Sequence, residues 1–228
     1  MTLSNNFKVV IFDFGGVLMS YDNYVQGWKD AEDALNLPNG SIHSIFHSIL
    51  TEVPNIDRQM FEGHLSAEEI EEEILPSFLS RKLGVEFPRP FPALHYWQGP
   101  GNRVRYNEKM VEAVRNLRKL GYRTALMTNN FKFNKENTTT RVPVDLALFD
   151  YVFESAVEGI MKPDREFYER VQSGLPSDVA PHHCVFLDDM KANCEAGERF
   201  GWTCVQVNPK DVSPSIEELE GLLGTRLF

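Results

Sequence analysis

A short apolar segment that ends in one carboxylate and two glycines constrains the fold of this chain more than any other feature. The residues Lys8–Phe12 are followed by Asp13, and Gly15 and Gly16 come close behind. An apolar run this short, bounded by glycines, is typical of a buried strand in a parallel sheet. Because ligands of open α/β sheets bind beyond the carboxyl ends of the strands, we expect Asp13 at the mouth of a site.

Strand and helix patterns alternate along the rest of the chain. Further strands are predicted at Tyr122–Thr128, Tyr151–Glu154, Cys184–Leu187 and Thr203–Val207. Helices are predicted at Asn107–Leu120, Glu166–Val171 and Lys191–Phe200, with short helices beginning at Pro143 and at a capping box Ser215–Glu218. This alternation predicts an α/β fold built on a doubly wound parallel sheet.

Polar residues suited to anion or metal chemistry follow three further apolar segments. Thr128 and Asn129 end the second strand, Lys162 precedes a proline, and the pair Asp188-Asp189 directly follows Val-Phe-Leu. Taken alone, a Thr-Asn-Asn sequence is more often a turn, and a lone lysine before proline is more often a surface residue. An Asp-Asp pair directly behind a buried strand is harder to explain as a solvated turn.

The spacing of these residues predicts an inserted helical cap. Asp13 and Thr128 are 115 positions apart, which is far too many for one strand–helix–strand crossover, whereas Lys162 follows Thr128 by only 34. Helical stripes occur at 24–35 and 42–49, a capping box lies at Ser66–Glu69, and a proline-rich return linker spans 85–100. We therefore expect a core of residues 1–20 and 99–228 with a cap of residues 21–98 that covers the strand ends.

Composition excludes several classes of function. The chain has 228 residues, 42% of them hydrophobic and 25% charged, and a net charge of −10. Such a charge makes nonspecific binding to nucleic acid or to an acidic membrane unfavourable. No segment has the length of a membrane span or the pattern of a signal peptide, so we expect a cytoplasmic protein. Three unpaired cysteines, at 184, 194 and 204, are interpreted as buried structural residues.

In their order along the chain, these motifs resemble those of the haloacid dehalogenase (HAD) superfamily. That family has a strand-end aspartate, a strand-end serine or threonine, a lysine and an acidic pair, which here correspond to Asp13, Thr128, Lys162 and Asp188-Asp189. Within the superfamily the chain most resembles the phosphatase-like N-terminal domain of soluble epoxide hydrolases. The segments that carry this likeness are Thr128-Asn129, Glu154-Ser155 through Lys162-Pro163, Val185–Asp189 and Glu217–Glu220.

The resemblance implies a Mg²⁺-dependent phosphatase that hydrolyses a small-molecule or lipid phosphate monoester through an aspartyl-phosphate. Asp13 is the implied nucleophile, and Lys162 neutralises charge on the phosphoryl group, with Thr128 and Asn129 also binding its oxygens. The implied magnesium ligands are Asp13, the backbone carbonyl of Gly15 and Asp189, with Asp188 assisting or pairing with the lysine. Carboxylates are the hard oxygen ligands that Mg²⁺ prefers. A monomer and a homodimer remain equally open.

One position departs from the family pattern. Phosphatases of this family usually carry a second aspartate two residues after the nucleophile, where it acts as the general acid, but here that residue is Gly15. General acid–base help is typically worth ~10²–10⁴-fold in rate. We therefore expect a slow phosphatase, one with a substitute acid such as Asp22 or a residue of the cap, or one limited to good leaving groups. The alternatives are a non-catalytic protein that binds a phosphorylated ligand or a partner, and a haloacid dehalogenase, which uses the same carboxylate without a metal.

Overall fold

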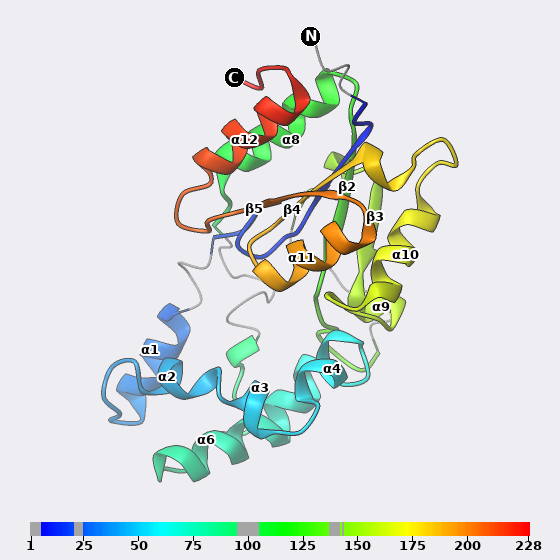
Figure 1. Ribbon diagram of the computed structural model, residues 1–228. Coiled ribbons are helices and arrows are strands. Elements are labelled where there is room, and N and C mark those ends of the chain that lie inside the picture. The colour runs from blue at the N-terminus through cyan, green and yellow to red at the C-terminus, as the bar shows by residue number, and fades with distance from the viewer. Residues whose placement is uncertain (1–5, 21–24, 95–104, 137–141, 143) are drawn as a thin grey trace.

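The core of the molecule is a five-stranded, all-parallel sheet. The computed structural model describes residues 6–20, 25–94, 105–136, 142 and 144–228. The strands are β1 (Val9–Phe12), β2 (Arg123–Thr128), β3 (Tyr151–Glu154), β4 (Cys184–Asp188) and β5 (Thr203–Gln206). They lie in the order β3-β2-β1-β4-β5 (Figure 1). The chain thus leaves β1 toward one edge and returns on the other side of it, which places a topological switch point between β1 and β4.

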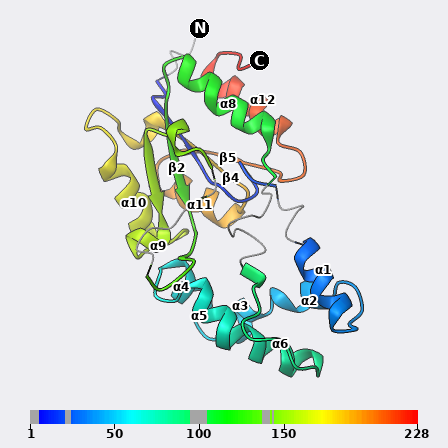
Figure 2. The same cartoon turned by 180° about the vertical axis from the view of Figure 1, so that it is seen from behind.

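Helices cover both faces of this sheet. One face carries α8 (Glu108–Lys119) and α12 (Ser213–Leu223), and the other carries α10 (Arg165–Gly174) and α11 (Lys191–Phe200), as Figures 1 and 2 show. A short α9 (Ser155–Glu158) follows β3, and 3₁₀ turns lie at Leu146–Leu148 and Pro181–His183. The predicted doubly wound α/β fold is confirmed.

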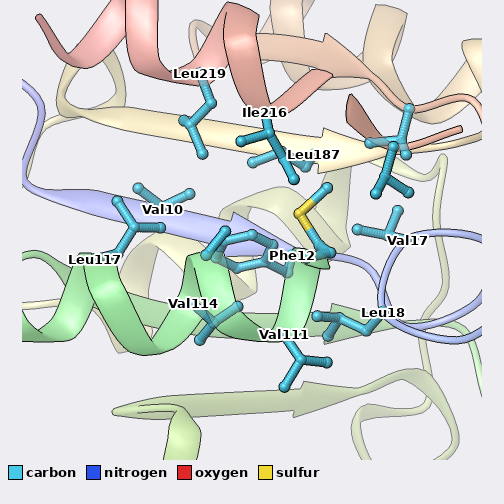
Figure 3. Packing of buried hydrophobic residues seen from close by; sticks show 14 of the residues in the cluster. Val10, Phe12, Val17, Leu18, Val111, Val114, Leu117, Leu187, Ile216 and Leu219 are labelled. Atoms are coloured by element: carbon cyan, nitrogen blue, oxygen red, sulfur yellow. The ribbon is translucent and has the colours of Figure 1, made fainter. Parts of the chain in front are cut away.

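Alternation along β1 divides the core into two apolar layers. Val10 and Phe12 belong to the layer under α8 and α12, whereas Val9 and Ile11 belong to the layer under α10 and α11. Figure 3 shows the first layer, with Phe12 between residues of α8 and α12. Successive side chains of a strand point to opposite faces of the sheet. Because helices cover both faces, all four residues of β1 are fully buried. Both layers hold β1 in place, and thereby fix the position of the residue that follows it.

The residues between β1 and α8 form a separate group of helices. Their bounds are α1 (Val25–Ala34), α2 (Ser41–Phe46), α3 (Ile49–Glu52), α4 (Ile56–Phe61), α5 (Ala67–Glu69), a π-helical segment Ile70–Ile74, and α6 (Leu75–Leu83). These helices share an apolar cluster around Trp28, Phe78 and Leu79, which Phe131 of the loop after β2 also joins. They lie beyond one end of the sheet (Figures 1 and 2). The predicted junctions at 20/21 and 98/99 adjoin or fall within residues outside the described ranges, so the domain division stays a prediction.

Some local predictions are confirmed and others are wrong. The capping box at Ser66 is present, since Glu69 N–H donates to Ser66 Oγ at 3.3 Å and Ser66 N–H donates to the Glu69 carboxylate at 2.9 Å. The capping box predicted at Ser215 is wrong. Its helix begins at Ser213 with Pro214 in the first turn, and the Ser215 hydroxyl donates to the carbonyl of Val212 instead. The helix predicted from Pro143 is only the 3₁₀ turn Leu146–Leu148.

No helix within the described ranges is both long enough and apolar enough to cross a membrane.

Candidate active site

Three carboxylates gather at the switch point of the sheet. Asp13 directly follows β1, Asp188 ends β4, and Asp189 comes next. Since Phe12 pairs with Leu187 across the two strands, the residues that follow them are neighbours, and the Asp13 N–H donates to the Leu187 carbonyl at 2.9 Å. One carboxylate oxygen from each aspartate lies within 4.8 Å of the others. The structure thus brings together all three acidic residues that the sequence singled out.

Lys162 lies between two of these carboxylates. Its ammonium nitrogen is 2.8 Å from Asp13 Oδ1 and 2.6 Å from Asp188 Oδ2, and it also donates to the Met127 carbonyl at 3.1 Å. An ammonium group has three N–H donors, so all of them are used. The side chain is 1% exposed. The lysine is therefore part of the site, as the resemblance implied, and not the surface residue that its local sequence would suggest.

The electrostatics of this cluster favour a cation beside Asp13. Burial raises the pKa of Asp13 to about 7, and the carboxylates of Asp188 and Asp189 add to this effect, although Lys162 opposes it. Burial works to lower the pKa of Lys162, but the carboxylates of Asp13 and Asp188 outweigh it and raise that pKa above its ordinary value. Three carboxylates share one ammonium group, so negative charge remains in excess. Hard oxygen donors this close together suit Mg²⁺.

Asp188 is fixed at both of its carboxylate oxygens. Oδ1 accepts from the N–H of Met190 and from Asn193 Nδ2, each at 2.9 Å, while Oδ2 accepts from Asn193 Nδ2 at 3.1 Å in addition to Lys162. Its exposed fraction is 0%. Of the two roles that the resemblance implied for Asp188, the pairing with Lys162 is the one seen in the structure. Asp189 is only half-buried.

Asn193 was missed by sequence reasoning, although it lies in the first turns of α11 and is 3% exposed. Asn193 follows the acidic pair by one helical turn, and this spacing could have indicated it. A residue at that distance in α11 lies next to the end of β4.

Thr128 and Asn129 end the strand next to β1. Thr128 is the last residue of β2 and is 2% exposed. The side-chain amide of Asn129 clamps the backbone of Lys162, since Nδ2 donates to the Lys162 carbonyl and Oδ1 accepts from the Lys162 N–H, both at 2.9 Å. Asn129 thereby positions the lysine, and its predicted contact with substrate stays a prediction. Gly15 is partly exposed beyond Asp13, and its predicted role as a carbonyl ligand also remains untested.

The inserted helices are attached to the loops that bear the site. Arg58 of α4 forms an ion pair with Asp164, two residues after Lys162, at 2.8 Å. The N–H groups of Ala67 and Glu68 donate to the carbonyls of Lys132 and Phe133, at 2.7 and 3.0 Å. These last two residues belong to the loop after β2. The inserted segment is thus fixed to the core on the β2 and β3 side.

Several other aromatic and histidine residues of the described ranges lie away from this site. Trp28 packs in the apolar cluster of the inserted helices, and His182 and His183 lie in the 3₁₀ turn that precedes β4, at the opposite end of that strand. Burial raises the pKa of Cys184 and of Cys194 to about 12, so both thiols are protonated and unreactive at neutral pH. Asp22, the suggested substitute acid, lies outside the described residues.

A parallel sheet with a carboxylate, a lysine and an acidic pair at its switch point defines a hydrolase-like α/β core. Residues 7–201 match the family model described as haloacid dehalogenase-like hydrolase, and the chain belongs to that family.

Individual relatives resemble the chain at 26–28% identity. It is 28% identical over 96% of its length to mouse acyl-CoA dehydrogenase family member 10, and 26% identical over 97% to pig bifunctional epoxide hydrolase 2. The chain spans only 19% and 40% of those two proteins. It is also 26% identical over 97% of its length to the sesquiterpene phosphatase astK of Aspergillus oryzae, of which it covers the whole length.

Solved structures share the fold. A HAD family enzyme from Bacteroides thetaiotaomicron, in complex with magnesium and inorganic phosphate, matches with a TM-score of 0.61 at 15% identity, over 90% of this chain and 96% of that one. A dehalogenase matches with a TM-score of 0.66 at 17% identity, over 99% of this chain and 100% of that one. At these identities the likeness establishes the fold and leaves open whether the reaction is phosphate ester hydrolysis or dehalogenation.

Proposed function

We propose that this HAD hydrolase is a Mg²⁺-dependent phosphatase of small-molecule or lipid phosphate monoesters. The observation that carries the proposal is the close group of Asp13, Asp188 and Asp189 with Lys162 held against two of them. A carboxylate nucleophile and a phosphate dianion repel each other, so the reaction needs positive charge between them. A haloacid dehalogenase would need no metal, so that alternative gives no role to the third carboxylate, Asp189.

The side chains of this group suit hydrolysis in two steps. Asp13 would attack phosphorus, forming a bond from its carboxylate oxygen while the bond to the ester oxygen breaks, and the departing alkoxide would take a proton from water. A water molecule would then attack the phosphorus, lose a proton to solvent and release inorganic phosphate, which regenerates the Asp13 carboxylate. Lys162 would neutralise developing charge, with Thr128 as a donor to the phosphoryl oxygens. Asp13, Asp189 and the Gly15 carbonyl would hold Mg²⁺, which, when bound, supplies the charge neutralisation that a phosphoryl group requires. Asp188 and Asn129 would keep the lysine in place.

The inserted helices contain an apolar cavity, which we propose takes an apolar part of the substrate. It has a volume of about 110 Å³ and is lined by Phe46, His47, Ile49, Leu50, Ile56, Met60, Phe61, Ile70, Leu75 and Leu94. Almost all of its surface is carbon. Apolar enclosed cavities bind hydrocarbon groups in preference to water. The sesquiterpene phosphatase and epoxide hydrolase relatives are consistent with a lipid phosphate.

Removing the metal should stop the reaction. We expect EDTA to abolish hydrolysis of p-nitrophenyl phosphate and added Mg²⁺ to restore it, because Asp13 cannot approach a phosphate dianion unaided. The measurement is the release of coloured p-nitrophenolate, followed by its absorbance. Full activity in EDTA would refute the metal-dependent proposal. Phosphate binding by calorimetry without any turnover would favour the non-catalytic alternative, and chelator-resistant chloride release from a 2-chloro acid would favour the dehalogenase.

Restoring a carboxylate at the general-acid position should accelerate the enzyme. For Gly15→Asp we expect kcat for alkyl phosphates to rise by roughly 10²-fold, because a poor leaving group then receives a proton as it departs. Gly15→Asn, which is similar in size but carries no acid, is the matched control. The measurement compares alkyl phosphates with p-nitrophenyl phosphate, whose leaving group needs no acid. Equal rates for Gly15→Asp and Gly15→Asn would show that the missing aspartate does not limit the reaction.

A further inference from the structure

A buried polar network at the end of β3 has no part in the roles described above. It consists of Asn130, Glu154 and Ser155, which are 4%, 9% and 0% exposed. Glu154 and Ser155 lie in one of the segments on which the resemblance rests, and neither has a role in the proposed reaction. Most polar side chains this deeply buried are hydrogen-bonded, and among the buried side-chain atoms of this network only Asn130 Oδ1 has no partner in the described part of the chain. Their partners therefore indicate what they do.

The hydroxyl of Ser155 binds both backbone groups of one residue. The N–H of Asn130 donates to Ser155 Oγ at 3.0 Å, and the same hydroxyl donates its own proton to the carbonyl of Asn130 at 3.2 Å. Asn130 is further held by its side chain, since Nδ2 donates to the carboxylate of Glu154. A residue outside β2 is thus fixed to the end of β3 by three hydrogen bonds.

This attachment lies next to the residues that face the phosphoryl group in the proposed reaction. Thr128 pairs with Glu154 in the register of β2 and β3, so it is fixed on one side of Asn129, while the Ser155 clamp fixes Asn130 on the other side. Asn129, in between, clamps the backbone of Lys162. Hydrogen bonds therefore join Ser155 to Asn130 and Asn129 to Lys162, and the peptide bond between Asn129 and Asn130 connects the two sets.

We propose that Ser155 is a positioning residue: by holding both backbone groups of Asn130, it sets the loop that follows Thr128 at the end of β2 and whose Asn129 clamps Lys162. This role rests on the proposed phosphatase function. The loss of a residue that merely stabilises a turn would lower the stability of the fold. Loss of the Ser155 hydroxyl should instead reduce the affinity for phosphate more than it reduces the stability of the fold. Small displacements of positioning groups have large effects on rate.

The test is a graded series at this position with inorganic phosphate as the binding probe. For Ser155→Ala we expect kcat/KM for p-nitrophenyl phosphate to fall on the order of 10- to 100-fold, and the Kd of phosphate measured by calorimetry in saturating Mg²⁺ to rise by about tenfold. Ser155→Cys, nearly the same shape with a weaker donor and acceptor, should be intermediate and safeguards the test if the alanine variant folds poorly. The Kd of Mg²⁺ alone should stay within about twofold, because the carboxylates are unchanged.

Ser215→Ala is the matched control. Ser215 is also a buried serine, 4% exposed, whose hydroxyl donates to a backbone carbonyl, but it lies in α12. Its removal should lower the melting temperature without changing phosphate affinity. The positioning role is overturned if Ser155→Ala keeps its phosphate affinity, or if Ser155→Ala and Ser215→Ala behave alike. If the unaltered protein neither hydrolyses the ester nor binds phosphate, the proposed function fails and this role fails with it.

Discussion

Asp13→Asn should reduce phosphate ester hydrolysis by about 10⁴-fold or more, which is the loss expected when a nucleophile is removed from a group of residues that act together. The amide has nearly the same shape as the carboxylate, and its oxygen can still accept from Lys162, which lies 2.8 Å from Asp13 Oδ1. The fold should therefore persist while the attacking oxygen loses its charge.

Stability provides an independent check on the same variant. Asp13 is 8% exposed, and its carboxylate lies near those of Asp188 and Asp189. Neutralising it removes a desolvated charge and its repulsion from two like charges, while Lys162 keeps Asp188 as its counter-charge, so the melting temperature without metal should not fall. The stabilisation that Mg²⁺ gives should shrink, because one carboxylate ligand is lost. Thermal unfolding with and without Mg²⁺ measures both quantities.

A covalent intermediate can be sought directly. Acid quenching of the unaltered enzyme during turnover, followed by peptide mass spectrometry, should place a phosphoryl group on Asp13. Asp211→Asn is the control, since Asp211 is exposed and accepts from the N–H of Ser213 at the start of α12. It should leave hydrolysis unchanged. Asp13→Asn with normal activity, or a phosphoryl group on another residue, would contradict the proposed nucleophile.

Local signals were sufficient for the strands and for one of the two capping boxes. The β-branched run before Asp13 and the segment Tyr151–Glu154 are strands as predicted, because a buried parallel strand requires only a short apolar run. The same Ser-x-x-Glu pattern was correct at Ser66 and wrong at Ser215. The difference arises because Pro214 already adopts the φ of a first helical turn, so the helix starts earlier and Ser215 falls inside it.

Contacts between distant segments lay beyond local patterns. The sequence around Lys162 is that of a surface lysine. The two carboxylates that surround its ammonium group come from the ends of β1 and β4, and no neighbouring residue indicates them. The clamp of Asn129 on Lys162 joins residues 33 positions apart, and the Ser155 clamp joins residues 25 apart. Each depends on which strands become neighbours in the sheet. Motif order could therefore indicate which residues meet, but not the hydrogen bonds that hold them.

Lys162→Met should have the second largest effect, on stability as well as on rate. The substitution keeps an unbranched apolar stem but removes the ammonium group, which leaves Asp13 and Asp188 buried and facing each other without a counter-charge. Breaking a buried ion pair by removing one partner typically costs about 3–5 kcal/mol. The hydrolysis rate should fall by roughly 10²–10³-fold, as for removal of one electrostatic group from an active site. Urea unfolding without metal and steady-state kinetics measure these two losses.

Magnesium ions should partly compensate for the lost lysine, and this response separates a charge effect from a packing defect. With the ammonium gone, the carboxylates attract a divalent cation more strongly, so a given Mg²⁺ concentration should raise the melting temperature of Lys162→Met more than that of the unaltered protein. Lys119→Met is the control. Lys119 lies in α8, 70% exposed, 3.7 Å from Glu112, and exposed pairs contribute only ~0–1 kcal/mol. A cation that enters between the carboxylates must restore the balance of charge that the ammonium group provides. If Lys162→Met is destabilised to the same degree with and without Mg²⁺, the lysine serves packing and not charge balance.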